Sequence, residues 1–255
     1  MTNNNLNSPG FLFDIDGCLT LPTKDDLTIG VLDIKLIDKI YELHHRQVPI
    51  AFVTGRSVGY LKKQYERYNR LKYQEIPAYI EFGLVRWING EIKVLKPAKH
   101  FTDLSKTLID ALAQYCVKYN IYFEPDMKYD DYPEHGWMWI ENKLIQLSIA
   151  AGKNITPSRL HEITLSAWKD FSSLARFLPH RFGINVIPLG WSKTKATEHF
   201  VSTLGCDESN YQWFVLGDDE SDREISKGLT YVNFVNTQKK ASKEVWALLK
   251  ALKIL

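Results

Sequence analysis

The chain has 255 residues, long enough for one large domain or two smaller ones with a substantial core. It has 32 Lys and Arg against 30 Asp and Glu, so the net charge of +2 gives no reason to expect nucleic acid or a membrane surface as a partner. Cys18, Cys116 and Cys206 lie far apart, which argues against a disulfide framework and a structural zinc site. The polar start carries no signal pattern, and no apolar run approaches the roughly 18 residues of a membrane span. We therefore expect a soluble cytoplasmic protein.

The first predicted strand is the apolar run 11–13, and two carboxylates, Asp14 and Asp16, follow it directly. Because side chains alternate along an extended chain, both point to the same side. In an open α/β sheet, ligands bind outside the carboxyl ends of the strands, and Gly17 lets the backbone turn there. The pattern indicates a site that holds a hard cation next to an electrophile, with a plain polar turn as the alternative. A calcium-binding loop is excluded because its glycine would stand at the sixth position and not the fourth.

A second candidate segment follows the second predicted strand, residues 48–53. Residues 29–46 before it carry apolar side chains at a helical spacing. After the strand comes Thr54-Gly55-Arg56, and then a further predicted helix. A threonine hydroxyl beside the free N–H groups of a helix start can bind an anion. We therefore expect an anion site here, with an ordinary turn as the alternative.

The pattern changes after a third predicted strand at 78–81. Asn89-Gly90 separates two short apolar runs, which is the strongest short-range signal of a hairpin. The elements predicted after the hairpin are helices at 102–119 and 157–178 and strands at 121–123, 137–149 and 182–187. They make up an inserted α+β domain at 84–188, roughly 100 residues long, within a core domain formed by 1–83 and 189–255.

The last part of the chain returns to alternating strands and helices. A helix is predicted to start near Lys193, and a strand at 213–216 ends in the acidic segment 217–222. Carboxylates this close repel one another unless they are exposed or bridge a cation, and an acidic helix start is the alternative. A strand at 231–235 and a helix at 242–252 follow. Strands that alternate with helices predict right-handed crossovers and a parallel sheet with helices on both faces.

Four motifs occur in order along the chain: D-x-D-G-x-x-T at 14–20, T-G-R at 54–56, Lys193 before a helix, and G-D-x-x-S-D at 217–222. Together they resemble the motifs of the haloacid-dehalogenase (HAD) superfamily. The resemblance implies an α/β fold, with a Rossmann-like parallel-sheet core and an inserted α+β cap domain. The junction at 81–83 reads E-F-G, where many phosphatases of this superfamily have E-N-G.

The resemblance also implies catalytic roles. Asp14 matches the nucleophile that takes up the phosphoryl group. Asp16 matches the general acid that protonates the leaving oxygen and then, as a base, activates water. Thr54 and Lys193 match the residues that hold the transferring phosphoryl group. A covalent aspartyl-phosphate splits one difficult displacement into two easier ones, and positioning and charge neutralisation supply most of the catalysis.

The implied cofactor is Mg²⁺. Asp14, Asp218 and the backbone carbonyl of Asp16 match its ligands. Asp222 matches the last motif position, which is either a metal ligand or a residue that orients one. Carboxylate and carbonyl oxygens are the donors that Mg²⁺ prefers, so the residue types agree with the implied site.

The inserted domain suggests the substrate. It resembles the larger α/β class of HAD cap, whose members include trehalose-phosphate, sucrose-phosphate and mannosyl-phosphoglycerate phosphatases. Segment 139–149 is similar to eukaryotic phosphomannomutases, in which a basic residue near the position of Lys143 helps to bind substrate. We therefore expect a Mg²⁺-dependent phosphatase of a phosphorylated sugar or polyol. Its expected substrate-binding residues are Thr54, Gly55, Arg56, Lys143 and Lys193. Two alternatives remain: a phosphohexomutase, and a catalytically silent binding module on the same fold.

Overall fold

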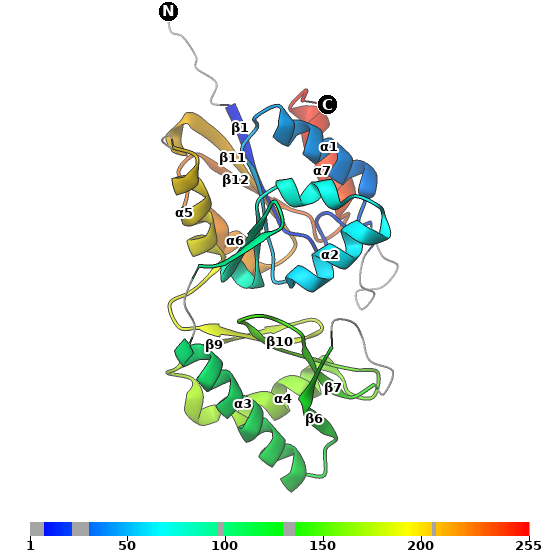
Figure 1. Cartoon of the computed structure of the whole chain (residues 1–255), viewed down its shortest axis with the longest axis vertical. Helices are drawn as coiled ribbons and strands as arrows, with labels where there is room; N and C mark the ends of the chain where they lie inside the picture. The colour runs from blue at the N-terminus through cyan, green and yellow to red at the C-terminus, as the bar shows by residue number, and fades with distance from the viewer. Residues whose placement is uncertain (1–7, 22–30, 96–98, 130–135, 206–207, 255) are drawn as a thin grey trace, which may run out of the picture. The chain divides into compact units, whose positions relative to one another are not determined.

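The computed structural model describes residues 8–21, 31–95, 99–129, 136–205 and 208–254. It divides into two compact units, which Figure 1 shows in a cartoon of the whole chain. The bounds of the first unit are Met1–Arg56, Lys62–Leu95 and Ser192–Leu255, and those of the second are Ser57–Leu61 and Lys96–Trp191. No helix that the structure describes is long and apolar enough to cross a membrane.

The first unit is built on a seven-stranded sheet with β1 at its centre. In spatial order the strands are β12 (Val232–Asn236), β11 (Tyr211–Gly217), β1 (Ser8–Phe13), β2 (Ile50–Val53), β3 (Ala78–Ile80), β4 (Val85–Ile88) and β5 (Glu91–Val94). The first five of these run parallel, and the last two are antiparallel to their neighbours. The predicted α/β class with a parallel sheet is therefore confirmed.

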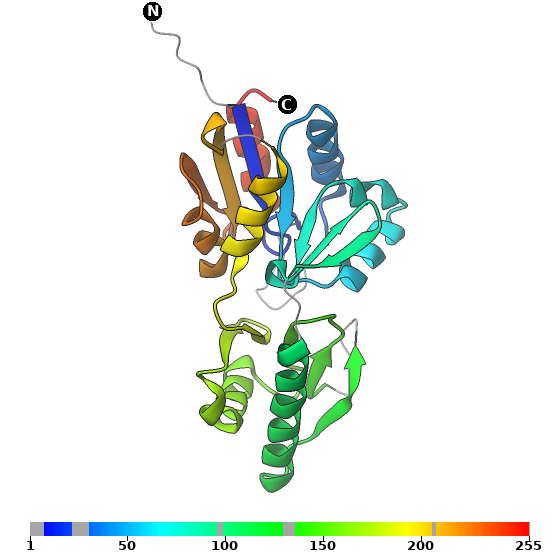
Figure 2. The ribbon, with the colours of Figure 1, turned by 60° about the vertical axis from the view of Figure 1, so that its left-hand side comes forward.

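Helices cover both faces of this sheet. They are α1 (Ile34–His45), α2 (Val58–Arg67), α5 (Lys193–Thr203), α6 (Glu220–Ser226) and α7 (Ser242–Ala251). Helices α5 and α6 lie on one side of the sheet, and α1 and α7 lie on the other (Figures 1 and 2). Parallel strands covered on both faces read as continuous apolar runs. Accordingly, Phe11, Leu12 and Phe13 of β1 are fully buried.

Residues 84–95 extend this sheet, which differs from the predicted start of the inserted domain at residue 84. Residues 81–83 have φ angles of 53°, 60° and 80°, and this left-handed turn reverses the chain so that β4 pairs with β3. Asn89 and Gly90 also have positive φ, as a two-residue hairpin turn requires, and β5 returns along β4. The expected hairpin is thus present, but its partner strand lies in the first unit.

The second unit has a five-stranded sheet and two helices. In spatial order its strands are β6 (Phe123–Tyr129), β7 (Met138–Glu141), β8 (Leu147–Ala150), β10 (Gly183–Pro188) and β9 (Ala175–His180). The helices are α3 (Lys99–Lys118) and α4 (Pro157–Ala167). The helix predicted over 157–178 therefore ends eleven residues early. The pairing of β9 with β10 across a short turn outweighs the local helical pattern of this segment.

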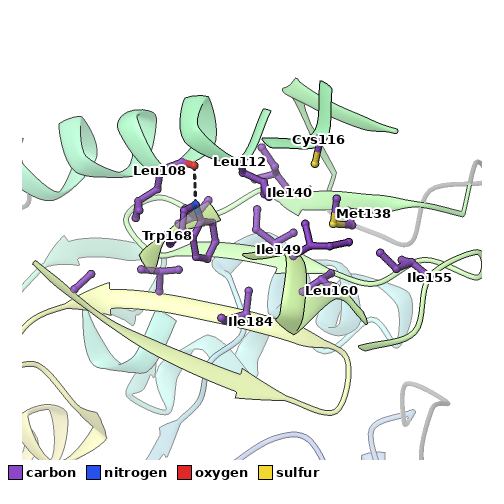
Figure 3. Packing of buried hydrophobic residues seen from close by; sticks show 14 of the residues in the cluster. Leu108, Leu112, Cys116, Met138, Ile140, Ile149, Ile155, Leu160, Trp168 and Ile184 are labelled. Carbon is purple, nitrogen blue, oxygen red and sulfur yellow. Dashed lines mark hydrogen bonds between the residues drawn. The ribbon is translucent and has the colours of Figure 1, made fainter. Parts of the chain in front are cut away.

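The core of the second unit lies between its helices and its sheet (Figure 3). Trp168 is 1% exposed, and its indole N–H donates to the backbone oxygen of Leu108 at 2.8 Å. Residues from α3, β7, β8, α4 and β10 belong to the same buried cluster, among them Leu112, Cys116, Met138, Ile140, Ile149, Leu160 and Ile184. Burying each large apolar side chain contributes about 1.5–3 kcal/mol, so this cluster is what stabilises the unit.

Candidate active site

The candidate site lies where β11, β1 and β2 end. These strands are adjacent and parallel, so the loops that follow them meet at one edge of the sheet. The backbone N–H of Asp14 donates to Leu216 at 2.8 Å, and that of Thr54 donates to Tyr79 at 2.9 Å, so both residues directly continue their strands. Asp14 is 5% exposed and Thr54 is 1% exposed. Two of the expected catalytic side chains therefore stand at the ends of neighbouring strands.

The loop after β1 needs its glycine. Gly17 has a φ of +64°, and its N–H donates to the Thr20 hydroxyl at 3.1 Å. A Cβ atom at Gly17 would lie 2.1 Å from a carboxylate oxygen of Asp218. Any side chain would therefore push Asp218 away, and the close approach brings the acidic segment after β11 next to the loop that carries Asp14.

Lys193 lies between two buried carboxylates. It is the first residue of α5, and its Nζ atom lies 2.9 Å from Oδ1 of Asp14 and 2.5 Å from Oδ1 of Asp222. The side chains of all three residues are at most 7% exposed. Charged groups are almost never buried in this way unless they are paired, so the triad holds Lys193 in one place by charge and by hydrogen bonds.

The acidic segment after β11 divides into residues with different tasks. Asp219 is the N-cap of α6, and its Oδ1 atom accepts hydrogen bonds from the N–H groups of Ser221 and Asp222. Asp222 uses Oδ2 to accept from the N–H groups of Asp218 and Asp219 at 3.0 and 3.2 Å. Asp222 thus fixes the turn that carries Asp218, in addition to holding Lys193. Asp219 stabilises the helix start, as an N-cap residue does.

The charges of the site do not balance. Burial raises the pKa of Asp14 well above its usual value, and the charges of Asp222 and Asp16 raise it further while Lys193 opposes them. Burial also raises the pKa of Asp222 to about 6. Burial would lower the pKa of Lys193, but the charges of Asp14 and Asp222 outweigh it and hold that pKa well above its usual value. One ammonium group therefore leaves surplus negative charge in the site.

The donor set fits a divalent cation. One carboxylate oxygen from each of Asp14, Asp218 and Asp222 can be chosen so that all lie within 4.8 Å of one another. Within the described part of the chain this is the one such cluster of His, Cys, Asp and Glu. Hard oxygen donors suit Mg²⁺, and a bound cation would favour the ionised form of Asp14, whose pKa is raised first by burial and then by the charges of Asp222 and Asp16.

Asp16 is paired in a way that the sequence did not predict. The guanidinium of Arg56 binds its carboxylate with two hydrogen bonds, of 2.6 and 2.8 Å. The side chains are 24% and 14% exposed, so the pair is partly open to solvent. The Thr54 hydroxyl accepts a hydrogen bond from the N–H of Arg56 at 3.3 Å. Arg56, expected to bind substrate, thus fixes the direction of the Asp16 carboxylate in this structure.

Phe82 is a residue of the site that the sequence reasoning did not include. Its ring lies against the segment after β2, because a Cβ atom at Gly55 would come within 2.9 Å of it. The Nζ atom of Lys193 lies 5.4 Å from the ring centroid. Glu81 and Phe82 both have a left-handed backbone, which costs roughly 1–2 kcal/mol for each residue with a side chain. The mismatch with the expected asparagine was the only signal in the sequence.

Lys143, the expected substrate contact of the inserted domain, lies between β7 and β8 of the second unit. Its Nζ atom is 2.8 Å from Oε2 of Glu141, and its side chain is 4% exposed. The hydroxyl of Ser148 donates to the same Glu141 oxygen at 2.6 Å. Lys143, Glu141 and Ser148 thus form a polar cluster in the second unit, whose main core is apolar.

Solved structures share this architecture. No family model matches the chain, and no curated protein matches it in sequence. A HAD/COF-like hydrolase from Plasmodium vivax is 16% identical with a TM-score of 0.64, and the match covers 99% of this chain and 98% of that one. A haloacid dehalogenase-like hydrolase from Bacteroides thetaiotaomicron is 9% identical with a TM-score of 0.61, covering 94% and 99%. The C-terminal domain of trehalose-6-phosphate phosphatase from C. albicans is 18% identical with a TM-score of 0.61, covering 97% and 78%.

These likenesses extend over nearly the whole chain, so they include both units. At identities of 9% to 18% they establish the fold. The chain has the fold of HAD-like hydrolases, and the resemblance drawn from four short motifs is confirmed at that level. Because fold does not fix function, the activity has to be argued from the site.

Proposed function

We propose that the protein is a HAD-type phosphatase that hydrolyses the phosphate monoester of a sugar or polyol with the help of Mg²⁺. The observation that carries the proposal is the buried group of Asp14, Lys193 and Asp222 at the ends of β1 and β11. Burying three charges is costly, and fixed charges at a strand end are what phosphoryl transfer requires.

In the first step Asp14 attacks the phosphorus atom, and the bond to the leaving oxygen breaks as the aspartyl-phosphate forms. Asp16 gives a proton to the leaving alkoxide. Lys193 and the Thr54 hydroxyl hold the oxygens of the transferring group. Mg²⁺ bound by the acidic cluster and the carbonyl of Asp16 would supply positive charge that offsets the repulsion between Asp14 and the phosphate. The surplus negative charge of the site supports this assignment.

In the second step Asp16 takes a proton from water, which attacks phosphorus and releases the phosphate from Asp14. The two hydrogen bonds from Arg56 favour the ionised form of Asp16, which is the form that accepts the proton from water. For the first step this pair has to open, so that Asp16 can carry the proton that it gives to the leaving oxygen. Asp222 accepts from the N–H groups of Asp218 and Asp219 and also binds Lys193, so we assign it the task of orienting these groups.

A sugar or polyol phosphate is the substrate class that the inserted domain favours. One solved structure of the same fold is a trehalose-6-phosphate phosphatase domain, and segment 139–149 is similar to phosphomannomutases. Lys143, held by Glu141, is our proposed contact to the substrate in the second unit. Gly55 and Arg56 are the proposed contacts beside Thr54 in the first unit.

A panel of sugar and polyol phosphates tests the proposal. Purified protein is incubated with each compound and Mg²⁺, and both free phosphate and isomerised sugar phosphate are measured. Release of phosphate from at least one member supports the proposal. Isomerised product without phosphate release would identify a phosphohexomutase, and binding without any turnover would identify a silent module. Either result overturns the phosphatase assignment.

A further inference from the structure

The Phe82 side chain lies close both to the segment after β2 and to the ammonium group of Lys193. It is 6% exposed, so its ring is a buried wall of the site. The Lys193 ammonium lies 5.4 Å from the ring centroid, within the range of a cation–π interaction. The same ammonium binds Asp14 and Asp222. Phe82 therefore adds an apolar contact to a group that is otherwise surrounded by charge.

The backbone around Phe82 is held in place from two directions. Its N–H donates to the Thr54 oxygen at 3.0 Å, and the N–H of Glu81 donates to the Arg56 oxygen at 3.0 Å. On the other side, a Cβ atom at Gly83 would lie 2.2 Å from the Cβ atom of Ala196 on α5. The turn at 81–83 therefore connects the Thr54 segment to the helix that carries Lys193.

The choice of side chain at this position is unusual for its backbone. A left-handed residue is best served by glycine or asparagine, and a bulky side chain at positive φ is a genuine outlier. Phe82 has a φ of 60° and a ψ of 27°. Such strain persists where surrounding contacts hold the residue in place, and it is most frequent at functional sites. Asparagine would fit this backbone and would offer Lys193 no aromatic face.

We propose that Phe82 is a positioning residue for Lys193: its ring covers the ammonium group and holds it between Asp14 and Asp222. The inference rests on the proposed function for its effect on catalysis, but not for its geometry. Lys193 is 3% exposed, and we assign part of its shielding from water to the Phe82 ring, while the two carboxylates bind the ammonium group directly. Phe82 touches no reacting atom and acts through Lys193.

Amine labelling tests the geometry whether or not the protein is a phosphatase. Wild type, Phe82→Leu and Phe82→Asn are reductively methylated under native conditions, and the rate at each lysine is read by peptide mass spectrometry. We expect the rate at Lys193 to rise about two- to thirtyfold in both variants, the range that loss of one cation–π contact corresponds to. The exposed Lys195 serves as the internal reference for reagent activity. Phe82→Asn fits the left-handed backbone and keeps the test valid if Phe82→Leu folds poorly.

Two controls separate positioning from general loosening. Lys143 is buried in the second unit, and its labelling rate should stay unchanged in both variants. Phe182 makes a similar contact, because the guanidinium carbon of Arg181 lies 4.8 Å from the centroid of its ring. Phe182→Leu removes that ring and should leave the labelling rate at Lys193 unchanged. An unchanged rate at Lys193 in the Phe82 variants, or a rise shared with Lys143, would overturn the inference.

A double-mutant cycle tests the effect on catalysis. Phe82→Leu should lower kcat on an aryl phosphate about two- to thirtyfold with little change in KM. In a Lys193→Met background the same substitution should have no further effect, because Phe82 acts only through the ammonium group. Effects that multiply would mean that Phe82 acts elsewhere and would overturn the inference. If the wild type releases no phosphate from any ester, the proposed function fails while the labelling result still decides the role of Phe82.

Discussion

Both units bury apolar side chains against their sheets, and the instructive comparison is between the charged group buried at the strand ends of the first unit and the apolar core of the second. In the first, an aspartate, a lysine and a second aspartate are buried together at the strand ends. In the second, the buried cluster is apolar, and its largest member, Trp168, has its one polar atom satisfied by Leu108. Burying paired charges adds little or nothing to stability, whereas burying apolar surface is the main stabilising term.

The difference shows which residues to expect in function and which in folding. A buried charged group that does not stabilise the protein needs another reason to be there, and positioning for chemistry is the one that the site offers. A fully satisfied tryptophan in an apolar core needs no such reason. Substitutions at Asp14 and Lys193 should therefore change the reaction, and substitutions at Trp168 should change the free energy of unfolding.

Asp14→Asn should have the largest effect. The amide cannot act as the attacking group, so kcat on an aryl phosphate should fall by roughly 10⁴ or more, as in other enzymes that lose their nucleophile. Lys193 keeps its contact with Asp222, so the urea midpoint of unfolding should change little. Asp219→Asn is the matched control: it removes a charge from the same edge of the sheet but still caps α6. Substantial activity in Asp14→Asn, or equal losses in both variants, would contradict the account.

Removal of divalent metal should rank second. With excess chelator, kcat should fall by roughly 10² to 10⁴, because the cluster of Asp14, Asp218 and Asp222 then keeps its surplus negative charge. Titration of the metal-free protein with Mg²⁺ should raise its melting temperature, and Asp218→Asn should weaken that shift. Full turnover in chelator, with no metal found in the protein by elemental analysis, would refute the metal assignment.

Lys143→Ala tests whether the second unit contributes to recognition. Loss of a charged hydrogen bond should raise KM for the best sugar phosphate roughly 10- to 100-fold and leave the kinetics on a small aryl phosphate unchanged. Lys169→Ala, on an exposed lysine of the same unit, should alter neither. Identical kinetics for wild type and Lys143→Ala on every substrate would mean that Lys143 serves only to pair with Glu141.

Trp168→Phe should have the smallest effect on chemistry and a clear one on stability. It removes the indole hydrogen bond to the Leu108 oxygen and leaves unfilled space in the core, so the free energy of unfolding should fall by about 1–3 kcal/mol in urea titrations. Activity on an aryl phosphate at 25 °C should stay within twofold of wild type. Trp137→Phe, at a half-buried tryptophan of the same unit, should cost less stability. A large loss of activity without loss of stability would break the contrast between the units.

The sequence predicted the first unit better than the second, for a physical reason. Each of its segments with Asp14, Thr54 and Asp218 follows a short apolar strand, and parallel neighbouring strands bring such ends together whatever the rest of the chain does. The sheet of the second unit is mostly antiparallel, and the sequence analysis found no such series of polar motifs after its strands. The helix predicted over 157–178 extended the helical spacing of apolar residues too far along the chain. Part of this segment is strand β9, which pairs with β10, and the residues of the segment alone do not indicate that pairing.

Two contacts within the site could not be predicted from the sequence. The pairing of Arg56 with Asp16 joins residues 40 positions apart, and each alone has an equally good role with substrate or water. The approach of Phe82 to Lys193 depends on a left-handed turn that the letters E-F-G do not predict, because glycine or asparagine is the usual residue there. Tertiary geometry, and not residue type, determines both.

The phosphorylated residue itself is the most direct test of the central claim, that Asp14 is the nucleophile and Asp16 the acid and base. Asp16→Asn retains the attacking group but loses the base that activates water, which should slow hydrolysis of the intermediate about 10² to 10⁴-fold. With an aryl phosphate, whose leaving group needs little protonation, the covalent adduct should then accumulate. Rapid-quench mass spectrometry should find it on Asp14. A phosphoryl group on another residue, or no adduct while phosphate is still released, would contradict the account.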